Sequence, residues 1–378
     1  MDRRHFLRTG LAAAGAVTLG PALWDRALAA PSSHGPYGPL GPPDANGIRL
    51  PAGFTSRVVA RSGLPVGTTG YVWHPAPDGG ATFATTGGGW IYVSNSEVPG
   101  TGGTGALVFG PDGSIVGAHR ILTGTSMNCA GGPTPWGTWL SGEEHDAGQV
   151  WECQPGATGQ GVARPALGTF SHEAAAVDPK RDHVYLTEDK PDGRFYRFTP
   201  DQAGDLSSGL LEAARVGADG SVDWQEVPDP NPLPVETPTR SQLPDTTAFN
   251  GGEGCWYHAG LVYFTTKGDN RVWEYRTSSR RLRVVYDGNA RPEAPLRGVD
   301  NVTVARNGDV LVAEDGDDMQ ICILRHKVVA PILQVVGNDD SEITGPAFDP
   351  SGTRLYFSSQ RGPAPIGPGI TFEVSGPF

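Results

Sequence analysis

The apolar residues of this chain fall in short runs of strand length, separated by turns that are rich in glycine, proline and aspartate. The clearest series comprises residues 171–179, 184–189 and 195–198, with a turn signal between successive runs. Runs of this length that contain many β-branched and aromatic residues are typical of β-strands. The pattern therefore predicts an all-β domain.

This three-strand series returns along the chain. Further copies occupy residues 342–374, 300–324, 253–275 and 128–153, and a weaker copy contains residues 89–109. Six copies between residue 51 and the C-terminus give a repeat of roughly 55 residues, which is typical of a four-stranded propeller blade with long loops. A β-sandwich of the same strands would not explain a repeated scheme, so we predict a six-bladed β-propeller.

The segment ahead of the first copy has a predicted role in closing the ring. Residues 54–60 form a strand without a blade of its own, and we expect it to pair with the last blade. Such pairing removes exposed sheet edges. Residues 31–50 are interpreted as an extended arm rich in proline and glycine, and residues 51–378 as a single propeller domain.

The composition limits the kinds of molecule that this protein is expected to bind. The chain of 378 residues has 54 glycines, 34 prolines and a formal net charge of −12. This acidity disfavours nucleic acid, because phosphate binding requires lysine and arginine. No apolar run of about 20 residues lies beyond the N-terminus, so no membrane span is expected. We expect a monomer that acts on a small molecule.

The N-terminus indicates export. Arg3 and Arg4 are followed by Phe6 and Leu7, then by a stretch rich in alanine, glycine and leucine. A small-x-small sequence that includes Ala29 completes the pattern. These features resemble a twin-arginine signal peptide over residues 1–30, so we expect a periplasmic or extracellular protein. This route carries folded proteins, which often take up a cofactor before crossing.

When the copies are aligned, metal-competent residues form two columns. The first column stands at the start of the first strand in five copies: Cys129, Glu173, Glu253, Asp300 and Glu342. The second stands at the end of the second strand: Glu97, Glu144, Asp189 and Asp315, with Lys267 and Gln360 in the other two copies. First strands line the central channel of a propeller, and second strands run back towards its start. Both columns are therefore predicted to meet at one mouth of the channel.

So many acids in one place require counter-charge, because like charges repel and burial adds a desolvation cost. Calcium prefers six to eight oxygen ligands, whereas a thiolate such as that of Cys129 suits iron, zinc or copper. The pattern leaves two possibilities open, a mixed-metal site or one metal near Cys129 with calcium elsewhere.

The other three cysteines carry no such signal. No pair of cysteines has the CxxC spacing of a zinc or thioredoxin motif. Cys322 lies in an apolar run and is predicted to be buried, whereas disulfide pairing among Cys153, Cys255 and Cys322 stays open. His172 precedes Glu173 and should alternate out of the channel as a packing residue.

Three segments carry a family resemblance. Residues 128–144, with the sequence NCAGGPTPWGTWLSGEE, are the longest, and residues 172–179 and 184–189 add to them. The chain resembles PhoX-type alkaline phosphatases over essentially its whole mature length. The resemblance implies a six-bladed propeller that hydrolyses phosphate monoesters with iron and calcium. It also implies that Cys129 ligates iron, that Glu173 and Glu253 bridge or bind iron and calcium, and that Asp300 and Glu342 lie on the calcium side.

One position departs from the family pattern. The resemblance implies a phosphate-binding arginine two residues before Glu253, where this chain has Gly251. Losing that charge weakens stabilisation of the transition state. Arg361, which follows Gln360 at the same mouth, is the predicted catalytic replacement.

The sequence supports a metal-dependent phosphatase first. No Ser-His-Asp arrangement or G-x-S-x-G elbow is recognised, which favours hydrolysis assisted by metal ions over a protein nucleophile. Two alternatives stay open, another metal-dependent hydrolase such as a lactonase and a non-catalytic binding propeller stabilised by calcium, because fold alone does not choose a function.

Overall fold

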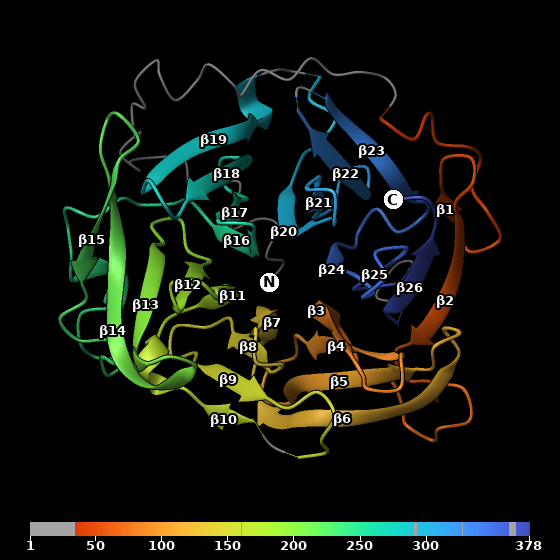
Figure 1. Cartoon of the computed structure of the whole chain (residues 1–378), viewed down its shortest axis with the longest axis horizontal. Coiled ribbons are helices and arrows are strands. Elements are labelled where there is room, and N and C mark those ends of the chain that lie inside the picture. Colours follow the sequence, from red (N-terminus) through yellow and green to blue (C-terminus); the bar gives the residue numbers. More distant parts are fainter. Residues whose placement is uncertain (1–34, 160, 291–292, 327, 363–367) are drawn as a thin grey trace.

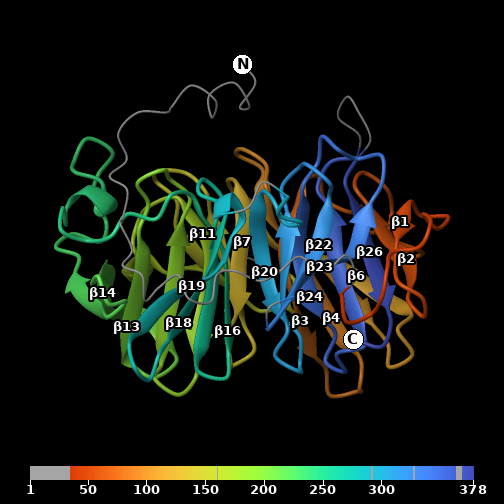
Figure 2. The same cartoon turned by 90° about the horizontal axis from the view of Figure 1, so that it is seen from above.

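A computed structural model describes residues 35–159, 161–290, 293–326, 328–362 and 368–378. Six antiparallel sheets stand around a central axis like the blades of a propeller (Figure 1). The predicted fold is thereby confirmed. In the view turned by 90°, strands of neighbouring blades run side by side, roughly along the axis of the ring (Figure 2). The predicted signal peptide lies outside the described residues.

The first three blades follow one another in the chain. Blade I comprises β3 (Pro77–Ala84), β4 (Trp90–Ser96), β5 (Gly102–Phe109) and β6 (Ile115–Thr125). Blade II comprises β7 (Asn128–Pro133), β8 (Trp139–Glu143), β9 (Val150–Cys153) and β10 (Val162–Ala163). Blade III comprises β11 (His172–Asp178), β12 (His183–Glu188), β13 (Phe195–Gln202), β14 (Asp205–Val216) and β15 (Val222–Glu226).

The other three blades include both strands from the N-terminal segment. Blade IV comprises β16 (Gly252–His258), β17 (Leu261–Thr266), β18 (Arg271–Arg276) and β19 (Arg281–Asp287). Blade V comprises β20 (Val299–Val304), β21 (Val310–Glu314), β22 (Gln320–Arg325), β23 (Val328–Val335) and β1 (Ile48–Arg49). Blade VI comprises β24 (Ile343–Phe348), β25 (Arg354–Ser359), β26 (Ile370–Ser375) and β2 (Thr55–Arg61). Short 3-10 helices span Pro165–Leu167, Thr239–Ser241 and Gly288–Ala290.

Ring closure occurs as the sequence predicts, and it involves one more strand. β2 pairs with β26, so an N-terminal strand completes the last blade. β1, which lies in the segment interpreted as an extended arm, pairs with β23 of blade V. Two adjacent blades are thus completed by the beginning of the chain. β1 and β2 thus become the outermost strands of these two blades.

Apolar side chains fill the spaces between blades. Between blades III and IV, the ring of Phe195 stacks on that of Phe264 at a centroid distance of 4.3 Å, and Phe264 stacks on Trp273. All three are buried. Alternate residues of each strand reach such inter-blade layers, as the period of two in a sheet requires. These layers hold the blades, and therefore their first strands, in fixed relative positions.

The first strand of each blade lies innermost and is irregular at its start (Figure 1). In blade III, His172 pairs with Glu188 but the next paired residue is Ala175, opposite Leu186. Three steps on β11 therefore oppose two steps on β12, which is a β-bulge. The same irregularity occurs in β3, β7, β16, β20 and β24. A bulge of this kind turns side chains away from the regular ladder and towards the axis.

Candidate metal centre

The bulges of five innermost strands present a metal-competent side chain at the same register position. That position holds Asp78, Cys129, Glu173, Glu253 and Asp300 in blades I to V. The four carboxylates among them are at most 3% exposed. Four of these five residues are members of the predicted first column, whose fifth member is Glu342.

Two members of the first column differ from the sequence alignment. Asp78 completes the column in blade I, but it was missed because the first strand of that blade was not recognised. In blade VI the equivalent position is Thr344, since Ile343 pairs with Ser359 as Pro77 pairs with Ser96. Glu342 therefore lies two residues ahead of the column, in the segment that enters the strand. It still reaches the mouth, where Asp78 and Glu97 lie close to it.

The second column returns to the same mouth, as predicted. Within the described residues, ligand atoms of the two columns form four groups whose members lie within 4.8 Å of one another. These groups are Cys129–Glu144–Glu173, Asp78–Glu97–Glu342, Glu173–Glu253–Asp300 and Asp300–Asp315–Glu342. Because Glu173, Asp300 and Glu342 are each shared by two groups, the four groups form one continuous cluster.

Asp189 is the one predicted ligand that the described groups do not include. Its charge still acts on the cluster, since it contributes to raising the pKa values of Glu253 and Asp300. The structure therefore brings together eight of the nine predicted ligands and adds Asp78.

Cys129 lies at one side of the cluster. Its Sγ donates to Oε1 of Glu173 at 3.3 Å. Burial, followed by the charges of Asp78 and Glu173, raises the pKa of the thiol well above its usual value. A thiol in such surroundings keeps its proton unless a cation is bound beside it.

The residues at this mouth fit bound metal ions. Oε2 of Glu173 is buried and has no hydrogen-bond partner among the described residues. Burial first, and then neighbouring carboxylates, raise the pKa values of Glu173 and Glu342 well above normal and that of Asp300 to about 6. Buried carboxylates normally have partners, so an unpartnered oxygen inside an acidic cluster indicates room for a cation.

Two basic side chains enter the cluster from its rim. Lys267 Nζ lies 2.8 Å from Oε1 of Glu253 and 3.2 Å from Oδ2 of Asp315. Arg361 Nη1 donates to Oε1 of Glu342 at 2.7 Å, and its side chain is 41% exposed. Arg361 therefore lies at the predicted mouth, with part of its guanidinium open to solvent.

The residue directly before each second-column acid points away from the mouth. Because strand side chains alternate, Glu143, Glu188 and Glu314 turn to the loops instead. The two oxygens of Glu314 accept hydrogen bonds from the backbone N–H groups of Arg297 and Gln320, both at 2.9 Å. The predicted second column leaves these three acids out and names the residue that follows each of them.

Gly251 and His172 occupy the places predicted for them. Gly251 has a positive φ of 69°, and a Cβ there would lie 3.3 Å from Oδ1 of Asp189. A side chain at this position would therefore be strained. The ring of His172 faces away from the axis, where it packs on Phe170 and contacts the carbonyl of Gly168 at 2.9 Å.

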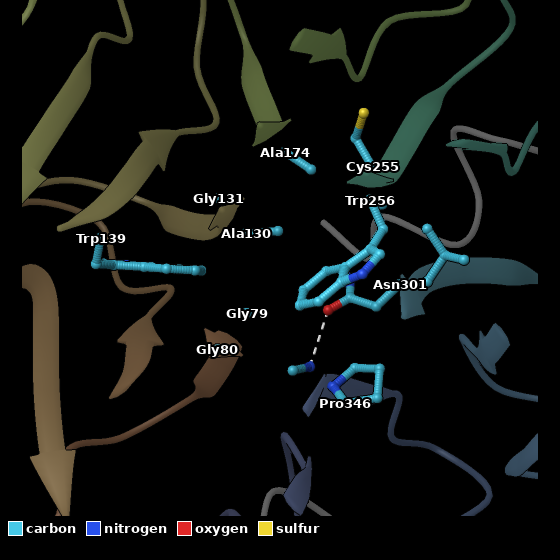
Figure 3. Close-up of a pocket in the computed structure, with 13 residues that line it drawn as sticks. Gly79, Gly80, Ala130, Gly131, Trp139, Ala174, Cys255, Trp256, Asn301 and Pro346 are labelled. Atoms are coloured by element: carbon cyan, nitrogen blue, oxygen red, sulfur yellow. Dashed lines mark hydrogen bonds between the residues drawn. The ribbon is translucent and has the colours of Figure 1, made fainter. Parts of the chain in front are cut away.

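Small residues line the channel next to the acids. Figure 3 shows Gly79, Ala130 and Ala174 on one side of a small pocket, with Asn301 on the other side. The Asn301 side-chain oxygen accepts the backbone N–H of Gly345 at 2.8 Å (Figure 3). A Cβ on Gly79 would lie 2.4 Å from the Cα of Ala130, so neighbouring first strands meet through glycine. The cluster is therefore the bottom of a bowl.

All four cysteines are free thiols. Cys153, Cys255 and Cys322 are buried, which confirms the prediction of a buried Cys322. No disulfide joins these residues, so the ring is held by strand pairing and packing.

Comparisons with known proteins bear on the chemistry of this site. The family described as alkaline phosphatase PhoX matches residues 68–157 and 145–362 of the chain. Among curated protein sequences, none matches significantly. Within the described residues, no helix has the length and apolarity needed to cross a bilayer.

Solved structures share the architecture. Pseudomonas fluorescens PhoX in complex with vanadate, a transition state analogue, matches with a TM-score of 0.72 at 16% identity, over 89% of this chain and 97% of that chain. A gluconolactonase from Xanthomonas campestris matches with a TM-score of 0.51 at 15% identity, over 91% of this chain and 99% of that chain. At such low identity these likenesses show the fold alone.

Proposed function

The chain belongs to the PhoX family of alkaline phosphatases and is a metal-dependent phosphatase, and on that premise we propose that it hydrolyses phosphate monoesters at the acidic mouth of the propeller. Iron is held beside Cys129, and calcium is held by the surrounding carboxylates. The substrate is a small soluble phosphate ester that enters the bowl from solvent.

One observation carries this proposal. The thiol of Cys129 and the carboxylates of Glu144 and Glu173 converge within 4.8 Å, and a buried oxygen of Glu173 has no partner among the described residues. A thiolate with two carboxylates suits iron, whereas a group of carboxylates alone suits calcium. Asp78, Glu97 and Glu342 form such an all-oxygen group. Glu253 and Asp300 extend the cluster from Glu173 and connect its two sides.

The bound ions supply positive charge that stabilises the transition state and lowers the pKa of water. The chain itself positions the ester. Arg361 holds Glu342 at 2.7 Å while part of its guanidinium faces solvent. A planar guanidinium can bind two phosphoryl oxygens at once. Arg361 thus takes the role of a phosphate-binding cation, because Gly251 offers no side chain for it.

Export is part of the same proposal. Residues 1–30, with Arg3 and Arg4, form a twin-arginine signal peptide, and the mature protein is periplasmic or extracellular. Folding before export lets the thiol and carboxylates take up metal in the cytoplasm. The prediction of a monomer accompanies this proposal.

Turnover of p-nitrophenyl phosphate and elemental analysis test the proposal together. Protein exported in its native form should contain iron and calcium, absorb visible light through a thiolate–iron band, and hydrolyse the ester. Cys129→Ser should lose the band and the iron, because an alcohol is a poor ligand for iron at neutral pH. Cys153→Ser is the matched control, since Cys153 is buried away from the cluster.

Arg361 is tested in the same assay. Arg361→Ala should lower kcat/KM by about 10²- to 10³-fold, because a charge that stabilises the transition state is lost. Arg215→Ala is the control, since Arg215 pairs with exposed Asp223 away from the mouth. Protein with calcium alone, no colour and turnover only of lactones would contradict the proposal and favour a lactonase on the same fold.

A further inference from the structure

The second column contains one cation. At the register position after the second strand, four blades carry an acid and blade VI carries Gln360, but blade IV carries Lys267. The acids at this position are Glu97, Glu144, Asp189 and Asp315. The chain thus places a fixed positive charge where four other blades supply a metal-competent oxygen.

Three carboxylates from two blades surround the ammonium group. Its Nζ lies 2.8 Å from Glu253, 3.2 Å from Asp315 and 3.7 Å from Asp300. Glu253 and Asp300 are nearly fully buried, at 2% and 3% exposed. The ammonium group is therefore ion-paired with all three carboxylates.

These three carboxylates are also members of the described metal-competent groups. Glu253 and Asp300 belong to one group with Glu173, and Asp300 and Asp315 belong to another with Glu342. A divalent ion in the second group would share Asp315 and Asp300 with the ammonium of Lys267. Two cations at such a short separation repel each other strongly in a buried site.

The remaining groups do not touch Lys267. Cys129, Glu144 and Glu173 form one of them, and Glu173 has a buried oxygen without a hydrogen-bond partner among the described residues. Arg361, the basic residue near the other group, pairs with two carboxylates, Glu342 at 2.7 Å and Glu97 at 3.8 Å, whereas Lys267 pairs with three. Lys267 is therefore distinguished by the number of ligands that it engages.

We infer that Lys267 is a resident cation that takes the place of one calcium ion between blades IV and V, so that this chain binds fewer metal ions than its carboxylate groups allow. The inference rests on the proposed function, since it concerns the metal content of that same site. One positive charge on a tethered side chain replaces two on a free ion. The part of the cluster formed by Glu253, Asp300 and Asp315 therefore stays occupied at any external calcium concentration.

Counting bound calcium tests the inference. Wild type, Lys267→Gln and Lys267→Asp are exported natively, freed of loose metal, and titrated with calcium by calorimetry and elemental analysis. Both variants should bind one more calcium ion per chain than wild type, and Lys267→Asp should bind it at least tenfold more tightly, because that substitution also supplies an acid. Lys190→Ala is the control, since Lys190 pairs with exposed Asp146 at the rim.

A variant that does not fold without calcium is still informative. Lys267→Asp should then show a thermal unfolding midpoint that rises with calcium much more steeply than that of wild type. Equal calcium counts in wild type and both variants, with no difference in this calcium dependence, would overturn the inference. Equal counts combined with weakened vanadate binding would instead make Lys267 a ligand for the phosphoryl group.

The same samples separate this inference from the proposed function. Wild-type protein that contains no iron and does not hydrolyse the ester would contradict the proposed function. The calcium counts of wild type and the Lys267 variants could still be compared in that case. An active, iron-containing enzyme that binds the same number of calcium ions as its Lys267 variants would contradict the inference but not the proposed function.

Discussion

At the scale of single residues, the cluster brings several buried carboxylates of like charge close together. Asp78, Glu173 and Glu253 are almost fully buried, and burial is the largest cause that raises the pKa of each. The neighbouring carboxylates add to this effect. Buried like charges are costly without counter-ions, so these side chains are better explained by ligand binding than by stability.

His172 provides a pH-dependent test beside the cluster. Burial lowers the pKa of this imidazole to about 4, although its contact with the carbonyl of Gly168 acts the other way. The folded pKa lies below the unfolded value of about 6.5, so the stabilisation is fully present above that pH and is lost as pH falls towards 4. The difference corresponds to about 3 kcal/mol.

Urea unfolding of wild type and His172→Gln at pH 4 to 7 measures this effect. The stability advantage of wild type over the variant should shrink by about 3 kcal/mol as the pH is lowered, because only wild type must protonate an imidazole on unfolding. An advantage that is constant over this pH range would show that His172 is not held neutral by burial.

At the scale of elements, the bulged first strands place the candidate ligands. A regular strand would alternate its side chains between the two neighbouring blades, whereas the bulge in β11 turns Glu173 to the axis. The hairpin partner then brings a second residue back to the same end. Glu314 fixes the surrounding loops through backbone N–H groups, so the adjacent Asp315 is presented from a supported position.

The closure of the ring also depends on an ion-paired carboxylate. Glu373 of β26 is 2% exposed and accepts hydrogen bonds from Arg57 of β2 at 2.6 Å and from Arg354 and Tyr356 of β25. It therefore connects the strand from the N-terminus to the blade formed at the C-terminus.

Glu373→Ala should destabilise the protein by about 3 kcal/mol, because it leaves two arginines and a buried hydroxyl without their acceptor. Arg57→Ala should cost less than about 1 kcal/mol, since the Arg57 side chain is 43% exposed and well solvated. Urea unfolding of both variants measures the difference. Equal losses would mean that the pairing of Arg57 accounts for the whole role of Glu373.

At the scale of the whole molecule, all six blades contribute to one bowl. The negatively charged carboxylates at its base repel one another. Carboxylates from all six blades approach within a few ångströms there, although they are far apart in the sequence. Cations that bind all of them also join the blades. Metal binding is thus expected to contribute to the stability of the complete ring.

Chelation should therefore destabilise the protein, and more so at high pH. Without metal, Asp300 has a pKa raised to about 6 by burial, and those of Asp78 and Glu342 are raised well above normal. Since these folded values exceed the unfolded ones, stability is present at low pH and is lost as pH rises through the folded pKa values.

Thermal unfolding with and without chelator at pH 5.5 and pH 8 measures this effect. The loss on chelation should be larger at pH 8 than at pH 5.5, because the buried carboxyl groups are more fully ionised at the higher pH. A loss that is the same at both pH values would show that the carboxylates do not drive the stabilisation by metal.

The sequence by itself determined the number of blades, the order of strands and most of the metal-competent residues that meet at the mouth. A repeat aligns equivalent strand positions, and strand periodicity is local, so Glu173 and Glu253 could be identified without coordinates. The closing strand β2 followed from the same logic. The functional class came from the resemblance of residues 128–144, not from periodicity.

Only the tertiary structure decided which side chains meet. Asp78 was not predicted, because an Asp-Gly pair such as Asp78-Gly79 is typical of a turn. In the structure this residue lies at the bulge of β3, which directs it into the bowl. Pairing register showed that Glu342 enters ahead of the column. The contacts of Lys267 with carboxylates of two blades depend on how far the packed blades bring those groups together. Distances of this kind arise from packing between blades, which a one-dimensional pattern does not specify.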